Sequence, residues 1–551
     1  MEQRRLSKQG WTSVFSVMRY GRELAQKLRE ARAAPDGPNR HALLRQVIDP
    51  YLQFVDGESM CEETGLRLAD LWRYFRHTWA TSYTNAPGRK FWILVRDRAA
   101  KYHPVIGIAA FGNAVVQLGP RDEWIGWMPK PFLSRLKQEA SRDWALWLQK
   151  AADEMAEAVY CADLVKENLI SRKELEDPTD EAIERLQKFA VVERKKHDAT
   201  PQADLHKFDE YVTTEEDWLT RAHSHLFRAK RAEALARVLQ VRKGLKRAGF
   251  AGATKDSLLK VLGDPAGRRA VEIVLRNVKA TRIGINMLEI TICGAVSPYN
   301  ALLGGKLVAM LLTSPEVVQE YERRYRKAYS LIASSTAGRA IQRRPNLVAL
   351  GTTSLYGAGS AMYNRIAIPA DAVGGKPGEV VRFEELGKSV GFGSIQFSPA
   401  TINEIEPILK SLTEGRQINH IFGEGVSPRL RKVRAGMEAV GIPPDKLMQH
   451  GTPRIVYGVG LAEQFRDVLL GRRVNKPRYY LPFENSVDVT QKIGDYWLRR
   501  WLSKRIERDE VFEQVERHTL VYPITHGARV ELPHIGTEDN YPLFKLLESR
   551  E

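Results

Sequence analysis

A glycine-rich turn between two apolar runs is the first feature of this sequence that could bind a ligand. Gly294–Leu311 reads GAVSPYNALLGGKLVAML, which is typical of a strand, a tight turn and a helix. The first backbone N–H groups of a helix favour an anion. The candidate anion-binding residues of this turn are Tyr299, Asn300, Gly304, Gly305 and Lys306. The alternative is that the paired glycines only let the helix pack tightly against the strand.

This turn matches neither the P-loop nor the coenzyme A loop of acyltransferases completely, which limits the ligands and reactions expected of it. A P-loop has the pattern GxxxxGK followed by Ser or Thr, but Asn300 stands at the first glycine and Leu307 at the hydroxyl. We therefore expect no nucleotide hydrolysis here. Acyltransferases hold the pyrophosphate of coenzyme A on a similar strand, loop and helix, with Arg or Gln three residues before a glycine. Ala301 occupies that position, so the acyltransferase signature is incomplete.

A second polar cluster follows the next apolar run. Leu350–Pro369 reads LGTTSLYGAGSAMYNRIAIP, in which hydroxyl side chains end a strand and two glycines form a turn. Ligands usually bind where the strands of an α/β sheet end. The candidate ligand-binding residues are Ser354, Ser360, Asn364 and Arg365, and Tyr363 is the candidate proton donor of a catalytic site. The alternative is a hydroxyl-capped turn with a tyrosine packed on the sheet.

Charged side chains lie beside two tryptophans in Gly119–Met128, which reads GPRDEWIGWM. A carboxylate that an arginine holds in an aromatic cleft is a candidate general base, and Asp122 has that environment. Trp124 and Trp127 could also stack on a nucleic-acid base. The alternative is that Arg121 and Asp122 only pair with each other.

The charge balance indicates a polyanionic partner. Lys and Arg outnumber Asp and Glu by 84 to 67, which gives a net charge of +17. Such a surplus attracts nucleic acid, and we expect DNA. Two basic stretches, 226–250 and 427–437, supply the candidate nucleic-acid-binding residues: Arg228, Arg231, Lys243, Arg247, Arg429, Arg431 and Arg434. The alternative is that these are solvated helix faces.

Several other functions find no support in the sequence. Three cysteines, far apart in the chain, indicate neither a zinc site nor a disulfide set, and we expect no metal site. No catalytic triad emerges from the spacing, and the cofactor is unknown. No apolar run is long enough to cross a membrane, and the N-terminus lacks the apolar core of a signal peptide, so we expect a cytoplasmic protein without a membrane partner.

The elements that must position these residues alternate between strand and helix. The expected fold is an α/β (α+β) core resembling an acyltransferase-like mixed sheet. Strands are predicted at Lys90–Asp97, His103–Gly112, 286–296, 346–355 and 393–398, and the stretches 41–55 and 66–80 are predicted to be helical. The expected divisions are an N-terminal helical region (1–84), a first core part (85–131), a helical insertion (132–255), a second core part with the motifs (256–400) and a basic mixed C-terminal region (401–551).

Three blocks of the sequence resemble, in order, those of the Druantia DruA family of bacterial anti-phage systems. The blocks are PVIGIAAFGNAVVQLGPRDEWIGW (104–127), CGAVSPYNALLGGKLVAMLLTSPEV (293–317) and TTSLYGAGSAMYNRI (352–366). The stretches GKSVGFGSIQFS, SPRLRKVRAGM and HGTPRIVYG resemble the downstream part of the family, so the likeness spans roughly residues 90–460. One departure is SAMYNR, because a second serine or a glutamine often follows Ser360 in the family.

The resemblance implies a role in antiviral defence and a large helicase as a companion of the same system. It assigns no catalytic residue, so the motif positions are expected only to share one site. Three functions stay open at this point. The chain is a DNA-engaging defence factor with a ligand or catalytic site in its core, a non-catalytic DNA-binding scaffold subunit that recruits the helicase, or an accessory protein of a transposon.

Overall fold

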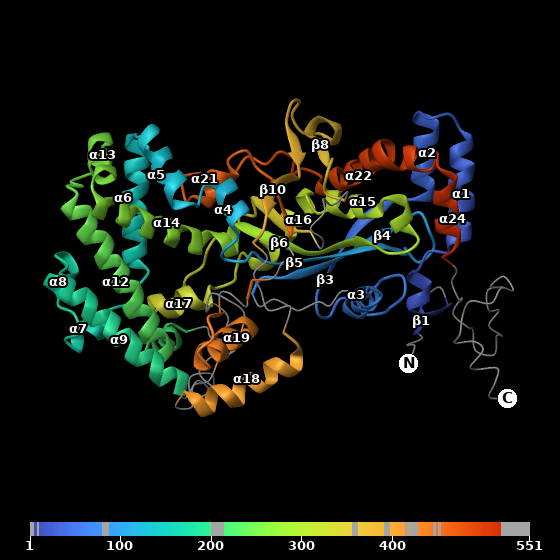
Figure 1. Ribbon diagram of the computed structural model, residues 1–551. Helices are drawn as coiled ribbons and strands as arrows, with labels where there is room; N and C mark the ends of the chain where they lie inside the picture. Colours follow the sequence, from blue (N-terminus) through green and yellow to red (C-terminus); the bar gives the residue numbers. More distant parts are fainter. Residues whose placement is uncertain are drawn as a thin grey trace.

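A mixed sheet forms the centre of the protein. The computed structural model describes residues 5–7, 10–79, 88–199, 214–354, 362–390, 397–413, 418, 428–444, 448–449 and 453–518. Its largest sheet has seven strands in the order β10 (Glu384–Lys388), β11 (Ile455–Gly460), β7 (Ala349–Thr353), β6 (Met287–Ala295), β5 (Val105–Asn113), β4 (Phe91–Asp97) and β3 (Pro50–Val55). The mixed α/β core is therefore confirmed (Figure 1).

The sheet is antiparallel except for its central pair. β6 and β7 run parallel, and they pair only from Met287–Ala349 to Glu289–Gly351. Beyond that point β6 continues to Ala295, while β7 ends at Thr353. The two strands therefore separate toward their carboxyl ends, where α/β sheets usually bind ligands.

Most of the predicted strands are confirmed. The apolar runs at 90–97 and 103–112 form the antiparallel pair β4 and β5, and the runs at 286–296 and 346–355 contain β6 and β7. The predicted strand at 393–398 falls largely on residues 391–396, which lie outside the described residues.

The prediction of a helix over 41–55 is wrong in its second half. Helix α2 (Pro38–Val47) ends before Pro50, and Pro50–Val55 is the edge strand β3. A proline disfavours the helical conformation of the residue before it, which is Asp49. Because an edge strand leaves one row of N–H groups unpaired, a proline is tolerated there. The sheet thus gains a strand that helical spacing of its apolar residues concealed.

Helices cover the sheet unequally on its two sides (Figure 1). One side packs against α1 (Gly21–Ala33), α15 (Gly304–Leu311), α16 (Pro315–Tyr325), α22 (Ser486–Trp497) and α24 (Asp509–Glu516), and we call it the α15 face. The opposite side, the α3 face, packs against α3 (Leu68–His77) over β3, β4 and β5. On the same face α4 (Gly119–Ile125) contacts β10 and β11.

A helical subdomain stands beside the sheet. Its main helices are α5 (Pro129–Gln138), α6 (Arg142–Glu157), α9 (Asp180–Ala199), α11 (Glu215–Ala222), α12 (His225–Arg247) and α13 (Lys255–Gly263). The long helix α14 (Pro265–Asn286) packs against α12 and α6 and leads directly into β6. The helical character expected of the insertion is seen, while its boundaries stay a prediction.

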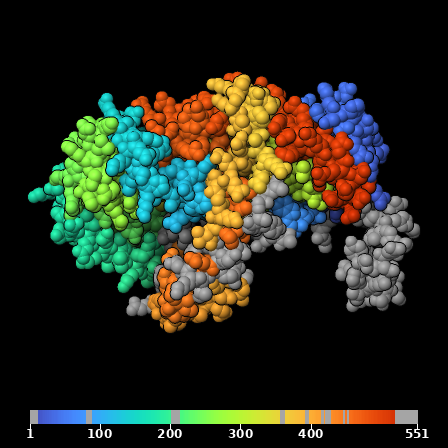
Figure 2. Space-filling model, turned by 45° about the horizontal axis from the view of Figure 1, so that its top comes forward, coloured from blue at the N-terminus to red at the C-terminus, as the bar shows by residue number. Residues whose placement is uncertain are grey.

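A pair of helices projects from the remainder of the chain. α18 (Pro399–Leu412) and α19 (Pro428–Ala439) pack on each other around a small cluster that includes Ile402, Val433 and Met437. Figure 2 shows this pair as an orange lobe at the lower edge of the molecule. The basic stretch 427–437 thus lies almost entirely on α19.

Candidate functional site

Asp122 lies in an ion-pair network. Its Oδ1 accepts a hydrogen bond from Nη2 of Arg121 at 2.7 Å, and its Oδ2 accepts one from Nζ of Lys279 at 2.5 Å. Arg121 Nη1 also donates to the carbonyl of Val115 at 2.6 Å. Both carboxylate oxygens are thus engaged by cations, and Asp122 could act as a base only after breaking these pairs. The internal pairing left open by the sequence is the arrangement found, with Lys279 of α14 added.

The Tyr299 side chain fixes its turn to the sheet. The ring is buried, and its hydroxyl donates to Oδ2 of Asp97, at the end of β4, at 2.6 Å. Oδ1 of Asp97 accepts from the backbone N–H of Asp49 at 2.9 Å and of Ala99 at 3.1 Å. Burial raises the pKa of Asp97, and burial followed by the nearby Asp97 raises the pKa of Tyr299. The tyrosine is therefore a structural anchor of the candidate anion-binding turn.

The two glycines of the turn sit at close contacts. A Cβ on Gly304 would lie 2.7 Å from the carbonyl oxygen of Tyr299 and 2.8 Å from Cβ of Ala295. A Cβ on Gly305 would lie 3.0 Å from Sδ of Met362. The packing alternative thus accounts for both glycines. C-terminal residues also cover the turn, because Trp497 Nε1 donates to the carbonyl of Leu303 at 3.3 Å.

Lys306 is buried on the α15 face. Its ammonium donates to the carbonyls of Met362 at 3.1 Å and Asn364 at 2.9 Å, and it lies 4.8 Å from the centre of the Trp501 ring. Burial, followed by the positive charge of Arg365, lowers the pKa of Lys306 to about 8. The lysine therefore ties α15 to the 362–364 turn through backbone carbonyls.

Replacing Lys306 by alanine should lower the free energy of unfolding by about 1.5–3 kcal/mol, because two charge-assisted hydrogen bonds to buried carbonyls are lost. Denaturant unfolding at neutral pH measures this. Arg365→Ala is the matched control, since Arg365 is exposed and should change stability by no more than about 0.5 kcal/mol. If Lys306→Ala unfolds like the wild type but loses anion binding, the lysine is a ligand contact and not a structural tie.

The remaining ligand-binding candidates are dispersed. Asn300 is exposed, and its side chain accepts from the N–H of Ala301 at 3.0 Å. Ser354 is buried between β7 and β11, where its hydroxyl accepts from the N–H of Ile455 at 3.0 Å. Ser360 lies outside the described residues.

Tyr363 reaches the point where β6 and β7 separate. Its ring is buried on the α15 face against Phe383 and Tyr457. Its hydroxyl lies near Cys293 of β6 and Thr352 of β7. Burial is the main cause that raises the pKa of Tyr363, and it raises the pKa of the Cys293 thiol to about 12. A neutral tyrosine is compatible with the predicted proton donor, which stays a prediction.

The residues predicted to share one site fall on opposite faces of the sheet. Tyr299, Lys306 and Tyr363 belong to the α15 face. Asp122 belongs to α4, whose Trp124 lies against Gly458 on the α3 face. The structure therefore does not bring Asp122 together with Lys306 or Tyr363.

Glu289 is a candidate ligand-site residue that lies outside the sites predicted from the sequence motifs. It stands in the central strand β6, is 8 % exposed, and its Oε2 is buried without a hydrogen-bond partner among the described residues. Burial raises the pKa of Glu289 to about 7, while Arg121 acts in the opposite direction. The sequence does carry a signal, since Glu289 is the only charged residue in the apolar run NMLEITICGAV. A charged residue in such a strand is rare unless it is paired.

The basic residues of α12 serve mainly to hold the helical subdomain together. Arg231 is fully buried and donates to both oxygens of Asp163, at 2.7 and 2.6 Å. Arg228 pairs with Glu167 at 2.6 Å, and Lys243 with Asp180 at 2.5 Å. Arg231 cannot reach a phosphate from this position, so its assignment to nucleic-acid binding is corrected to a structural one. Arg247 is exposed at the end of α12 and stays a candidate.

The basic residues of α19 are more exposed to solvent than Arg231 of α12. Arg434 is exposed and forms a surface pair with Glu438 at 3.3 Å. Arg429 is partly exposed and donates to the carbonyl of Phe397 at 2.7 Å. Arg431 is also partly exposed on this helix. These three stay candidates for phosphate contacts.

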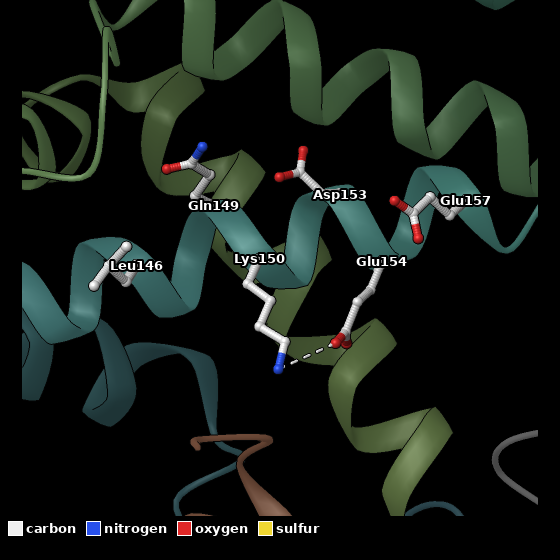
Figure 3. Close-up of a pocket in the computed structure, with 6 residues that line it drawn as sticks. All are labelled: Leu146, Gln149, Lys150, Asp153, Glu154 and Glu157. Carbon is white, nitrogen blue, oxygen red and sulfur yellow. Dashed lines mark ion pairs between the residues drawn. The ribbon is translucent and has the colours of Figure 1, made fainter.

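A shallow hollow lies along the exposed side of α6 and encloses about 440 Å³. Figure 3 shows Lys150 and Glu154 paired on one side of the helix, with Gln149, Asp153 and Glu157 on the other. Every lining residue comes from this one helix, so nothing converges on a ligand. Within the described ranges no group of three or more His, Cys, Asp or Glu residues could hold a metal ion. Among the described helices, none has the length and apolar composition needed to cross a membrane.

Comparison with known proteins places the chain in a family. The family model described as Druantia protein DruA matches residues 38–142 and 275–471, which together exceed half of the chain. The matched stretches contain all seven strands of the large sheet. The gap between them, 143–274, holds nearly all of α6, the helices from α7 to α13 and the first part of α14. A curated relative, Druantia protein DruA of Escherichia coli strain UMEA 4076-1, is 26% identical over 278 residues.

The likeness to that relative is partial in length. The aligned region covers 48% of this chain and 63% of the relative. No solved structure matches the chain. The three motif blocks, the strands that carry them and the family match agree, and the chain belongs to the Druantia protein DruA family.

Proposed function

We propose that this protein is a bacterial anti-phage defence protein of the Druantia type that engages nucleic acid and carries a small-ligand or catalytic site in its α/β core. Membership of the DruA family supports the defence role. We further propose that it acts in the cytoplasm, together with a large helicase of the same system.

The observation that carries nucleic-acid binding is the composition of α19. The helix reads PRLRKVRAGMEA, with four cations and a single acid, Glu438. It belongs to the lobe that projects from the molecule (Figure 2). Cations on a projecting element can approach the phosphate backbone without rearranging the core, and the net charge of +17 favours the encounter. We expect DNA to be the nucleic acid.

Binding to duplex DNA should weaken steeply with salt, by about 0.9 in log K for each phosphate neutralised per unit of log salt. Replacing Arg429, Arg431 and Arg434 together by alanine should reduce that slope by about three units. Fluorescence anisotropy with a labelled duplex over a range of salt concentrations measures the slope.

The matched control is a triple alanine variant of Arg135, Lys150 and Lys188, which lie outside both basic stretches and pair with Glu139, Glu154 and Glu184. This variant removes the same formal charge and should change the slope less. A slope that is flat in the wild type, or that the α19 variant leaves unchanged, would contradict the proposal.

For the core we propose an acyltransferase-like sheet. Two features support it: the central parallel pair β6 and β7 separates at its carboxyl end, and β6 leads through a tight turn into α15. The alternative is a non-catalytic scaffold subunit that recruits the helicase. The paired carboxylate of Asp122 and the burial of Tyr363 favour that alternative. Mass spectrometry of small molecules that co-purify with the native protein distinguishes them, since a scaffold needs no ligand in the core.

A further inference from the structure

Glu289 lies in a row of residues that crosses the sheet on the α3 face. Its neighbours in register are Gly112 on β5 and Gly351 on β7, and Gly351 is in turn paired with Gly458 on β11. Residues in register across a sheet point to the same face. Because these neighbours are glycines, no side chain of β5, β7 or β11 stands in the row beside Glu289. The row is therefore a strip of glycines with one carboxyl group on it.

The carboxyl group extends over this strip. A Cβ on Gly351 would lie 2.9 Å from Glu289 Oε2 and 2.8 Å from Cε of Met287. A Cβ on Gly458 would lie 3.0 Å from the Trp124 ring. Glu289 and Trp124 thus lie over adjacent glycines of the same row.

Solvent reaches the sheet one step away. β6 has an extra residue at Thr291, where its register with β5 shifts, and Thr291 is exposed. Thr353, the next residue of β7 on the same face, is half-buried. Glu289 itself is 8 % exposed, so the carboxyl group is close to an open part of the sheet without being solvated.

Arg121 of α4 is the charged group that acts on Glu289. It belongs to a network of two cations and one carboxylate, because Arg121 and Lys279 of α14 both hold Asp122. On the other side of the strand, Cys293 and Tyr363 are kept neutral by raised pKa values. In the described part of the chain, no donor reaches Oε2 of Glu289. A buried carboxyl group without a donor is costly, and the missing donor is the feature that points to a ligand.

We propose that Glu289 is the proton-accepting residue of an unassigned ligand site on the α3 face, and that this site receives the amino group of a small amine. An amino group supplies the donor that Oε2 lacks. The ligand enters past Thr291 and Thr353. The inference rests on the core ligand site of the proposed function and is independent of nucleic-acid binding.

Carbodiimide coupling to methylamine tests the site in the wild-type protein. The O–H of a protonated carboxyl group adds across a carbodiimide, and an amine that enters then displaces the urea to leave an amide. With N,N′-dicyclohexylcarbodiimide and methylamine at pH 6.5, peptide mass spectrometry should find the methylamide at Glu289. The matched control is Glu320, which is also 8 % exposed but is paired with Arg323 and Arg324. Modification of Glu289 should exceed that of Glu320 at least tenfold and should fall at pH 9.

A variant of Gly351 tests whether this glycine borders the site. Gly351→Ala places a methyl group beside the carboxyl group and should reduce amide formation at Glu289 at least fivefold. Gly119→Ala, where a Cβ meets nothing within 4 Å, should leave it unchanged. Both variants are checked for native circular dichroism and for an unchanged DNA salt slope. An unmodified Glu289, or one that carries only the rearranged carbodiimide adduct without amine, would overturn the proposal. Either result leaves the nucleic-acid part of the proposed function standing.

Discussion

Replacing Asp122 by alanine should lower the free energy of unfolding by about 3–5 kcal/mol. The side chains of Arg121, Asp122 and Lys279 are 1%, 7% and 14% exposed, so the variant leaves two buried cations without their counter-charge. Breaking a buried ion pair from one side costs this much because the remaining charge is no longer solvated by water or by a partner. Burial already lowers the pKa of Lys279, which Asp122 opposes. Urea unfolding followed by tryptophan fluorescence measures the loss.

Two further variants define what the Asp122 result means. Asp122→Ala combined with Lys279→Met should recover part of the lost stability, because one uncompensated cation is removed. Glu438→Ala breaks the surface pair with Arg434. The side chains of Arg434 and Glu438 are 50% and 48% exposed, so the variant should lower the free energy of unfolding by no more than about 1 kcal/mol. If Asp122→Ala unfolds like the wild type and instead abolishes an activity, Asp122 is the general base expected from the sequence.

Local patterns predict the strands well because a buried strand reveals itself by its apolar content. The run NLVALGTTSL contains β7, and NMLEITICGAV contains β6. The strand at Pro50–Val55 escapes prediction because apolar spacing in a short segment suits either a helix or an edge strand. Pro50 is the local signal that favours the strand.

The site is harder to predict because its geometry depends on pairs that are distant in sequence. Lys279 and Asp122 are separated by 157 positions, and no residue near Asp122 in the sequence indicates that Lys279 pairs with it. The opposite faces of Asp122 and Lys306 follow from strand order and register, which no motif encodes. Glu289 is different, since a lone acid in an apolar strand is visible in the sequence. Motifs direct attention to glycine-rich turns, whereas a single charged residue belongs to no motif.

Charge runs illustrate the same limit in the basic helices. α12 and α19 look alike in sequence, and both are expected from it to hold phosphates. In the structure Arg231 of α12 is buried against Asp163, whereas Arg434 of α19 is exposed. The difference lies in the acids of α7 (Ala162–Lys166) and α9 that pack against α12. A basic helix is thus a candidate for nucleic acid only after its acidic neighbours are known.

Replacing Glu289 by glutamine should make the protein more stable than the wild type at pH 8 by about 3 kcal/mol, and this advantage should disappear below pH 4.5. Burial raises the pKa of Glu289 from 4.5 to about 7 in the folded protein. A tenfold difference in acidity between the folded and unfolded states corresponds to about 1.4 kcal/mol. Below pH 4.5 the carboxyl group is protonated in both states. As the pH rises toward 7, the unfolded state ionises first, so the wild type loses stability relative to glutamine, which does not titrate.

Urea unfolding of both proteins at pH 4.5, 6 and 8 measures this difference. The Cys293 thiol, with a pKa of about 12, and the Tyr363 hydroxyl stay neutral across this range, so neither obscures the titration of Glu289. Glu289→Asp is the second variant, because it keeps a titrating carboxyl group but withdraws it from Gly351. It should retain a pH-dependent loss of stability that glutamine abolishes. If the free energies of unfolding of the wild type and Glu289→Gln instead change in parallel with pH, the carboxyl group is ionised in the folded protein. Its Oε2 would then need a hydrogen-bond donor that the described residues do not supply.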